Sequence, residues 1–364
     1  MKLARPTSGW HPLARAGSAD HPLVRARHVF PRPIGAATSF QPPSRPMNDH
    51  SPPLVAILGP TASGKSALAV HLAHQLDGEI IICDSTQQYR GFDIGTGKPT
   101  SAERQGVPHH LLDVLSPGEE ATAGAYREMA VAVLENLRAR KKLPILTVGT
   151  GLYMRALLEG LADLPQRSEE LRARLRAMLE KHGQSYLHRL LKRLDPQSAQ
   201  RIFPADMQKV IRAVEVCILA RRPLTEVHQA GRNPLTGWHI LKIGLQPPRE
   251  ALYARIHSRI DQMLAAGWQS EVLQLLAANP SARSKPFDFL GYRELAAVTR
   301  NEMTLADARA AIQQSTRHYA KRQQTWFRRE PQITWFPNSG DDGNLQSAVL
   351  KHLVGLIEEP SRKI

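Results

Sequence analysis

The chain is poor in the residues that disulfide frameworks, structural zinc sites and membrane spans require. Cys83 and Cys217 are its only cysteines, too few for a disulfide framework or a four-cysteine metal site. No apolar run approaches the ~20 residues that a helix needs to cross a bilayer. We therefore expect a soluble protein of a reducing compartment, the cytoplasm.

Acidic residues are also scarce, because the 364 residues hold 33 Asp and Glu against 48 Lys and Arg. The resulting formal net charge of +15 favours a polyanionic partner, most simply nucleic acid, with a membrane surface as the other candidate. A chain of this length can bury a sizeable core and hold two domains.

Residues 1–50 have no sustained hydrophobic period. They contain eight prolines and seven Lys or Arg, against only two acids, Asp20 and Asp49. This composition predicts a disordered, basic, proline-rich extension. An organelle transit peptide is the alternative, but the prolines deny it a long amphipathic helix. Met47, just before the first apolar segment, is a candidate for the natural start.

A phosphate-binding loop is the strongest signal in the chain. It follows the short apolar run 54–58 and precedes apolar residues at helical spacing, which is the strand-loop-helix context that the G-x-x-x-x-G-K-[ST] motif requires. Lys65 would reach a terminal phosphate, and the Ser66 hydroxyl would hold Mg²⁺. The loop alone does not say whether the phosphates belong to a nucleotide or to another diphosphate. Its residues are Gly59, Pro60, Thr61, Ala62, Ser63, Gly64, Lys65 and Ser66.

A second buried strand is predicted at 79–85, and it places Asp84 at its carboxyl end. In open α/β sheets that end faces the ligand crevice. From position alone, Asp84 is equally a Mg²⁺ ligand, a general base or the N-cap of the next turn. The polar, glycine-punctuated loop 86–99 follows, and long polar loops beside a phosphate site usually bind something.

The remaining pattern predicts an α/β fold with a P-loop NTPase-like parallel sheet flanked by helices and an inserted all-helical domain. Strands are expected at 143–148 and 239–245. Between them, the helical stretch 163–233 carries 14 Lys or Arg against 8 Asp or Glu, which suits either an RNA-binding insertion or a solvated charged face. We expect the catalytic core to span 51–162 and 236–335, the insertion 163–235, and a C-terminal tail without readable chemistry 336–364.

Two later helices carry exposed cations in this prediction. Arg255 and Arg259 are four residues apart on a helix after 247–248, so they could face the diphosphate together or lie on the surface. The run 308–329 has six Lys or Arg and no acid, which predicts one basic face and one packing face. Two of its aromatic residues, Tyr319 and Trp326, are at least as suited to the core as to RNA.

Several longer segments extend the pattern beyond the phosphate-binding loop. In order and spacing they resemble the bacterial tRNA dimethylallyltransferases, also called tRNA isopentenyltransferases or IPP transferases, over about residues 54–330. The matching segments are GPTASGKS (59–66), DSTQQYRGFDIGTGKP (84–99), VPHHLLDV (107–114), PILTVGTGLYMRALLEGL (144–161), DMQKVIRAVEV (206–216), GLQPPREALYARIHSRIDQML (244–264), GYRE (291–294) and KRQQTWFR (321–328). One departure is Val148, which replaces the first glycine of the family's V-G-G-T-G-L-Y and puts the geometry just before Thr150 in question.

The resemblance implies transfer of a dimethylallyl group from dimethylallyl diphosphate to N6 of adenosine 37, next to the anticodon, in tRNAs that read codons beginning with U. It implies Asp84 as the general base and Thr150 at the acceptor nucleotide. Lys65, Ser66 and Arg259 would hold the diphosphate, with Mg²⁺ as the cofactor. The implied tRNA contacts are Asp84, Ser85, Thr86, Gln87, Thr150, Gln208, Lys209, Val210, Ile211, Arg212, Lys321, Arg322 and Gln323, with Lys209 standing where the family usually has arginine.

Two other classes of protein also fit the phosphate-binding loop and the charge. One is a P-loop kinase or ATPase, against which the strand at 143–148 ends in Val148 and Gly149 rather than in a second carboxylate. The other is a nucleotide-gated RNA-binding protein. A relative that prenylates free adenine nucleotides is a closer rival. We expect a monomer with no protein partner and no membrane association.

Overall fold

The computed structural model describes residues 51–229, 231–278 and 285–358, all of which belong to the second of the chain's two compact units, Met47–Ile364. The predicted extension 1–50, with the candidate start Met47, lies outside the described residues. Within the described part of the chain, no helix is long and apolar enough to cross a membrane.

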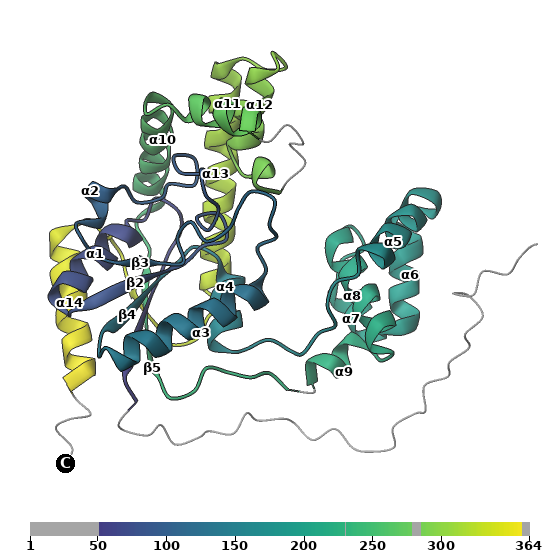
Figure 1. Ribbon diagram of the computed structural model, residues 1–364, viewed down its shortest axis with the longest axis horizontal. Helices are drawn as coiled ribbons and strands as arrows, with labels where there is room; N and C mark the ends of the chain where they lie inside the picture. The colour runs from purple at the N-terminus through teal and green to yellow at the C-terminus, as the bar shows by residue number, and fades with distance from the viewer. Residues whose placement is uncertain (1–50, 230, 279–284, 359–364) are drawn as a thin grey trace, which may run out of the picture. The chain divides into compact units, whose positions relative to one another are not determined.

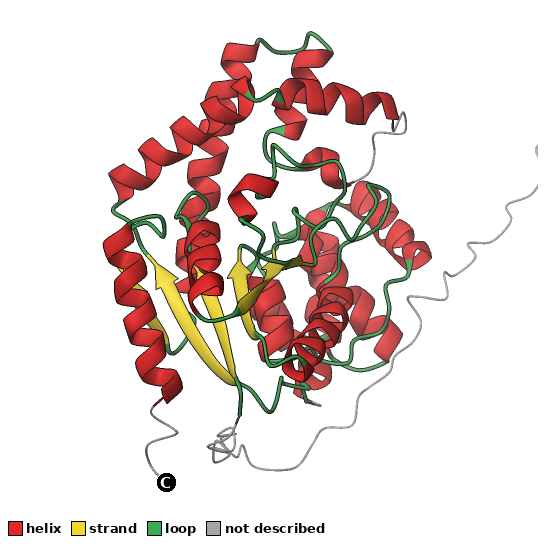
Figure 2. Ribbon diagram, turned by 60° about the vertical axis from the view of Figure 1, so that its left-hand side comes forward, coloured by secondary structure: helices red, strands yellow, loops and turns green. Residues whose placement is uncertain are grey.

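The described residues form one sheet of six parallel strands in the order β3-β2-β4-β1-β5-β6 (Figure 2). The sheet confirms the predicted α/β fold, and the predicted strands at 143–148 and 239–245 have the observed bounds. The sequence did not predict β3 or β6. The strands are β1 Pro53–Leu58, β2 Gly78–Cys83, β3 His109–His110, β4 Leu143–Val148, β5 His239–Leu245 and β6 Ile333–Phe336.

Helices cover both faces of the sheet because its central strands are apolar on both sides. In β1, Val55 and Ile57 face a core built with α1 (Lys65–Gln75) and α14 (Gly343–Glu358). Leu54, Ala56 and Leu58 face the opposite core, which α3 (Ala123–Ala139) and α4 (Gly151–Leu158) close (Figure 1).

A third hydrophobic core lies between the loop that follows β2 and the helices between residues 249 and 327. Its largest members are aromatic and fully buried: Tyr89, Phe92, Trp268 and Tyr292. They join the loop after β2 to the later helices, so this loop is held by packing rather than by regular backbone pairing. The elements here are α10 Arg249–Ala265, α11 Trp268–Ala278, η1 Lys285–Asp288, α12 Tyr292–Thr299 and α13 Leu305–Phe327, and the short helix α2 Ser101–Arg104 has no buried residue.

The segment predicted as an all-helical insertion consists of helices with a hydrophobic core of their own. Leu187, Leu191, Val210 and Val214 are fully buried in that core. The buried Asp195 carboxylate caps one helix by accepting from the N–H of Ser198 at 2.9 Å. The helices are α5 Glu169–His182, α6 Gln184–Leu194, α7 Pro196–Arg201, α8 Met207–Ala220 and α9 Leu224–Gln229.

The C-terminal segment differs from the tail that we expected at 336–364. Strand β6 pairs with β5, so the sheet extends to Phe336. Leu345, Val349 and Leu353 of α14 are buried in the same core as α1. The loop between them also touches the phosphate-binding loop, since the N–H of Gly340 donates to the carbonyl of Ser63 at 2.9 Å. A segment with one weak apolar pattern is therefore part of the core.

Candidate active site

The predicted site residues meet at the carboxyl edge of the sheet. The phosphate-binding loop follows β1, Asp84 follows β2, and Gly149 and Thr150 follow β4. Because β4 lies between β2 and β1 and all three strands are parallel, these segments are neighbours at one edge. The sheet order therefore assembles segments that are between 18 positions (Ser66 to Asp84) and 91 positions (Gly59 to Thr150) apart in the chain.

The phosphate-binding loop has the tight curvature that an anion site needs. Two of its residues have left-handed backbone angles, Ala62 with φ of 62° and Gly64 with φ of 81°. Gly64 is the N-cap of α1, and the helix begins with Lys65 and Ser66 rather than with an acid. Backbone N–H groups at this helix end carry partial positive charge and favour a phosphate or diphosphate.

Lys65 is folded back onto its own loop. Its Nζ donates to the carbonyls of Gly59 and Pro60, both at 2.9 Å. Burial lowers the pKa of Lys65 to about 8; Asp84 nearby opposes the change and Arg259 adds to it. A diphosphate would supply the negative charge that this desolvated ammonium lacks.

The Asp84 carboxylate has one oxygen engaged locally and one directed at the turn after β4. Its Oδ1 accepts from the N–H of Thr86 at 2.9 Å and from the Thr86 hydroxyl at 2.7 Å. This oxygen therefore caps the turn that follows β2, as the N-cap alternative predicted. A Cβ at Gly149 would lie 2.0 Å from Oδ2. Gly149 therefore permits the close approach of Asp84, and the departure at Val148 is placed elsewhere: its side chain is fully buried in the sheet core.

Thr150 and the residues after Asp84 share a hydrogen-bond network. The Thr150 hydroxyl accepts from the N–H of Ser85 at 3.1 Å and lies 3.3 Å from the Ser85 hydroxyl. The Gln87 amide donates to the carbonyls of Thr96 and Gly97 at 3.2 and 3.1 Å. Gln87 thus braces the polar loop 86–99, while Ser85 contacts Thr150.

Two of the three arginines of α10, Arg255 and Arg259, reach this edge. Arg259 donates to the Gly97 carbonyl at 3.2 Å, and burial lowers the pKa of its guanidinium, which stays charged. Arg255 donates to the carbonyl of Ala62 in the phosphate-binding loop at 2.9 Å and pairs with Asp341 at 2.9 Å. Arg255 is therefore tied to the loop backbone.

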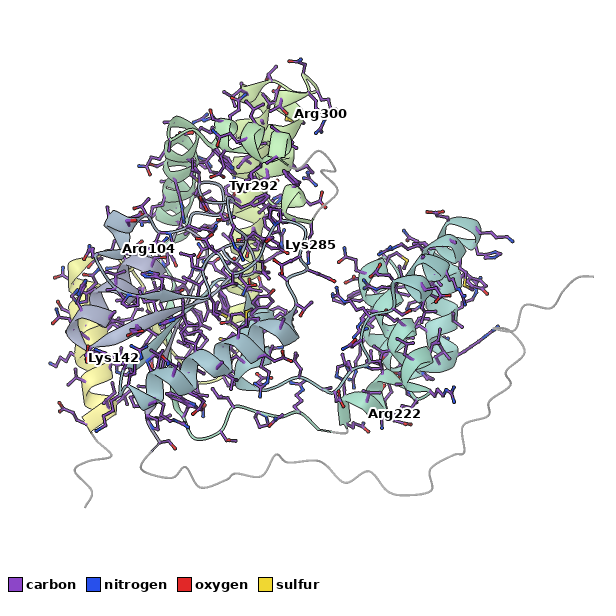
Figure 3. The ribbon with its side chains drawn as sticks, in the orientation of Figure 1. Arg104, Lys142, Arg222, Lys285, Tyr292 and Arg300 are labelled. Carbon is purple, nitrogen blue, oxygen red and sulfur yellow. The ribbon has the colours of Figure 1, made fainter. Side chains whose placement is uncertain are left out.

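Glu271 of α11 is a residue that the sequence analysis missed. Its carboxylate accepts from the N–H groups of Asp93 at 3.1 Å and Ile94 at 2.7 Å, and from the Tyr292 hydroxyl at 2.6 Å. Tyr292, labelled in Figure 3, is fully buried. Glu271 thereby fixes the turn that carries Gly97. The only sequence signal was one acid in an apolar helix.

The predicted RNA-contacting segment of α8 is divided between surface and core. Gln208 and Lys209 are exposed, whereas Val210 and Ile211 are buried in the core of the insertion. Arg212 donates to the carboxylate of Glu215 at 2.7 Å and to the carbonyl of Pro165 at 3.0 Å. Of these residues, only Gln208 and Lys209 have exposed side chains that an RNA could contact.

The basic run of α13 is divided in the same way. Lys321 and Arg322 are exposed, and the Arg322 guanidinium lies 5.7 Å from the Tyr319 ring. Gln323 is buried against the phosphate-binding loop. Trp326 is 38% exposed and lies 4.8 Å from the Arg155 guanidinium, so it is not a simple core residue.

A metal ion at this site would depend on ligands from the substrate. Within the described ranges, no group of three or more His, Cys, Asp or Glu side chains is placed to hold one. Ser66 is exposed at the start of α1 and offers a hydroxyl oxygen. One protein oxygen combined with phosphate oxygens and water is the coordination that Mg²⁺ prefers, so these residues fit that ion.

Comparison with protein families gives a match that begins just after Asp84 and covers most of the chain. The family model described as IPP transferase matches residues 87–330. The chain is 52% identical over 291 residues to a tRNA dimethylallyltransferase of Koribacter versatilis, covering 80% of this chain and 94% of that protein. It is 46% identical over 298 residues to a tRNA dimethylallyltransferase of Solibacter usitatus, covering 82% and 97%.

Solved structures agree with these sequence relatives. The crystal structure of a tRNA isopentenylpyrophosphate transferase from Bacillus halodurans is 35% identical, with a TM-score of 0.63, and covers 85% of this chain and 98% of that one. A eukaryotic dimethylallyltransferase acting on tRNA, 24% identical with a TM-score of 0.73, covers 85% and 80% and supports the fold alone. The family match, the sequence identity and the shared fold together show that this chain belongs to the IPP transferase family.

Proposed function

We propose that this chain transfers a dimethylallyl group from dimethylallyl diphosphate to N6 of adenosine 37 in tRNAs that read codons beginning with U. A bond forms between N6 and the first carbon of the allylic group as the bond from that carbon to diphosphate breaks. The N6 proton passes to a base, and the products are N6-(dimethylallyl)adenosine and diphosphate. Named tRNA dimethylallyltransferases of similar length support the reaction class.

The observation that carries the proposal is the meeting of an anion-binding loop and a carboxylate at one edge of the sheet. The phosphate-binding loop connects β1 to the N-terminus of α1. Gly149 follows the neighbouring strand β4, and Asp84, which follows the next strand β2, lies beside Gly149. A diphosphate in the loop would leave its allylic carbon near the free oxygen of Asp84. One side of the site thus suits a leaving anion and the other suits proton removal.

On the diphosphate side, we assign the loop N–H groups, Lys65 and Arg259 to the growing negative charge of the leaving group. Ser66 would hold Mg²⁺, which when bound neutralises phosphate charge. Arg255 holds the loop from behind through the Ala62 carbonyl. Fixed positive groups in a site shielded from water are the largest kind of catalytic contribution in such reactions.

On the acceptor side, we assign Asp84 as the general base. The adenine N6 amine is a poor nucleophile because its lone pair is delocalised into the ring, so proton removal typically contributes about 10² to 10⁴ in rate. Thr150, Ser85, Thr86 and Gln87 would contact the nucleotide after it leaves its stack, at a cost of about a few kcal/mol.

Exposed cations, together with one neutral amide, would bind the tRNA backbone. We assign Gln208 and Lys209 of α8 and Lys321 and Arg322 of α13 to phosphate contacts, with Arg212 held by Glu215 in support. Such contacts offset the cost of base extrusion and make binding fall steeply with salt. The side chains of Val210 and Ile211 are buried in the core of the insertion, so only their backbone atoms are left for a contact with RNA. We further propose a monomer of the cytoplasm.

The test is to mix the purified chain with labelled dimethylallyl diphosphate and an anticodon stem-loop that contains adenosine 37. We expect label in the RNA, without ATP, and loss of label when position 37 is another base. ATP consumption with unlabelled RNA would instead identify a kinase or ATPase, and RNA binding without either would identify a binding protein. Faster prenylation of AMP than of RNA would point to the free-nucleotide reaction.

A further inference from the structure

A buried glutamine of α13 connects the two sides of the site. Gln323 is 6% exposed, and its amide group makes two hydrogen bonds in opposite directions. Its Oε1 accepts from the N–H of Thr61 in the phosphate-binding loop at 2.8 Å. Its Nε2 donates to the carbonyl of Gly149 at 2.8 Å, so one side chain satisfies a donor on one segment and an acceptor on the other.

The two partners belong to the segments whose separation matters for transfer. Thr61 is in the loop that would hold the diphosphate, and Gly149 is the residue against which the free oxygen of Asp84 lies. Both segments are loops, and loops by themselves hold a spacing poorly. Gln323 instead extends from a helix that is anchored by the buried residues Ile312, Ala320 and Phe327.

We propose that Gln323 is a positioning residue for the transfer reaction: it sets the distance between the bound diphosphate and the side of the site formed by Asp84 and Thr150. The proposal rests on the proposed function. For this one residue it replaces the tRNA contact that the family resemblance implied, because both polar groups of the side chain are already used inside the protein. Gln323 touches neither reacting atom and acts through Thr61 and Gly149.

The size of the effect follows from the geometry of the reaction. The nucleophile, the allylic carbon and the leaving oxygen must lie nearly in line, and an error of about 1 Å in such an arrangement can cost about 10² in rate. Loss of the Gln323 bridge would leave the Thr61 N–H without its partner, and would leave the Gly149 carbonyl with only the long contact from the Tyr319 hydroxyl at 3.5 Å. Each segment would then shift toward water or another partner, and the alignment would be lost while the RNA-binding surface remained.

The experiment compares two variants with a matched control. Gln323→Met keeps the volume and removes both hydrogen bonds. Gln323→Glu keeps an acceptor for the Thr61 N–H but places an oxygen against the Gly149 carbonyl. Gln314→Met makes the same chemical change at an exposed position of the same helix. The measurements are single-turnover transfer at saturating dimethylallyl diphosphate and stem-loop, the RNA Kd, and thermal unfolding.

For Gln323→Met we expect transfer at saturation to fall about 10- to 100-fold, with the RNA Kd within about twofold of the original. Gln323→Glu should lose at least as much as Gln323→Met, because it places a buried negative charge against the Gly149 carbonyl, and Gln314→Met should match the original protein. A weaker RNA Kd with a normal rate at saturation would overturn the proposal in favour of an RNA contact. Normal rates, or failure of both Gln323 variants to fold by circular dichroism, would also overturn it. If the original protein forms no product at all, the proposed function fails instead.

Discussion

The sheet edge and the helical insertion use polar residues in different ways. At the edge, Asp84 and Thr150 are held by named partners between 2.7 and 3.3 Å away, which leaves little freedom in their placement. In the insertion, Lys209 extends into solvent and pairs with the nearby Asp206. The difference teaches that chemistry needs fixed geometry, whereas phosphate binding needs mainly charge at the surface.

The largest expected effect tests the chemistry at the sheet edge. Asp84→Ala should lower the single-turnover transfer rate by about 10² or more, because the base is removed. RNA affinity should stay nearly unchanged, since the exposed cations remain. A rate within a few-fold of the original would remove Asp84 as the base, and Asp84→Asn, which keeps the shape, should be as slow as Asp84→Ala.

Gly149→Ala should also slow transfer, by about 10- to 100-fold. The added Cβ would lie 2.0 Å from Asp84 Oδ2, so the carboxylate must move. Single-turnover rates and RNA Kd values check this, and an unchanged rate would show that the carboxylate has room.

The neighbouring residue provides the matched control for Gly149. Val148→Gly should cost stability, about 2 to 4 kcal/mol, because it opens a cavity in a fully buried strand. Transfer at a temperature where the variant is folded should be near the original rate. Denaturant unfolding measures the loss of stability. A loss of transfer rate as large as that of Gly149→Ala would contradict the assignment of Val148 to the core and Gly149 to the site.

Lys65 predicts a pH dependence of diphosphate capture. The pKa of Lys65 in the free protein is about 8, so its ammonium is charged below that pH and loses its proton above it. The kcat/KM for dimethylallyl diphosphate should therefore fall by up to about tenfold per pH unit above pH 8. Lys65→Arg should lower kcat/KM overall and remove this fall, because guanidinium stays protonated. A flat profile for the original protein would contradict the prediction.

The smallest expected effect tests phosphate binding by the helical insertion. Lys209→Ala should weaken stem-loop binding a few-fold and reduce the slope of log Kd against log salt by about one, with transfer at saturation unchanged. Lys142→Ala is the control, because Lys142 lies just before the amino end of β4, the edge of the sheet away from the site (Figure 3). Equal effects of both variants would show that Lys209 contributes only to the general positive charge of the surface and makes no specific phosphate contact.

Local pattern was enough to predict several elements of the fold. The buried strands have long apolar runs, and the phosphate-binding loop has glycines and a lysine at fixed spacing, so β4, β5 and the loop were predicted at their observed positions. Strand β3 has two residues and β6 four, too short for a period of two to appear. The C-terminal helix α14 was missed as core because its apolar pattern is weak until a neighbour covers it.

Sequence by itself determined the chemistry available to this protein: a phosphate-binding loop, a carboxylate after a buried strand, and helices rich in cations. Only tertiary structure decided which atoms meet. The order β2-β4-β1 brings Asp84 beside Gly149, and α13 and α11 supply Gln323 and Glu271 from more than 170 residues away. The physical reason is that residue type and spacing fix local conformation, whereas contacts between distant segments depend on how complete elements pack.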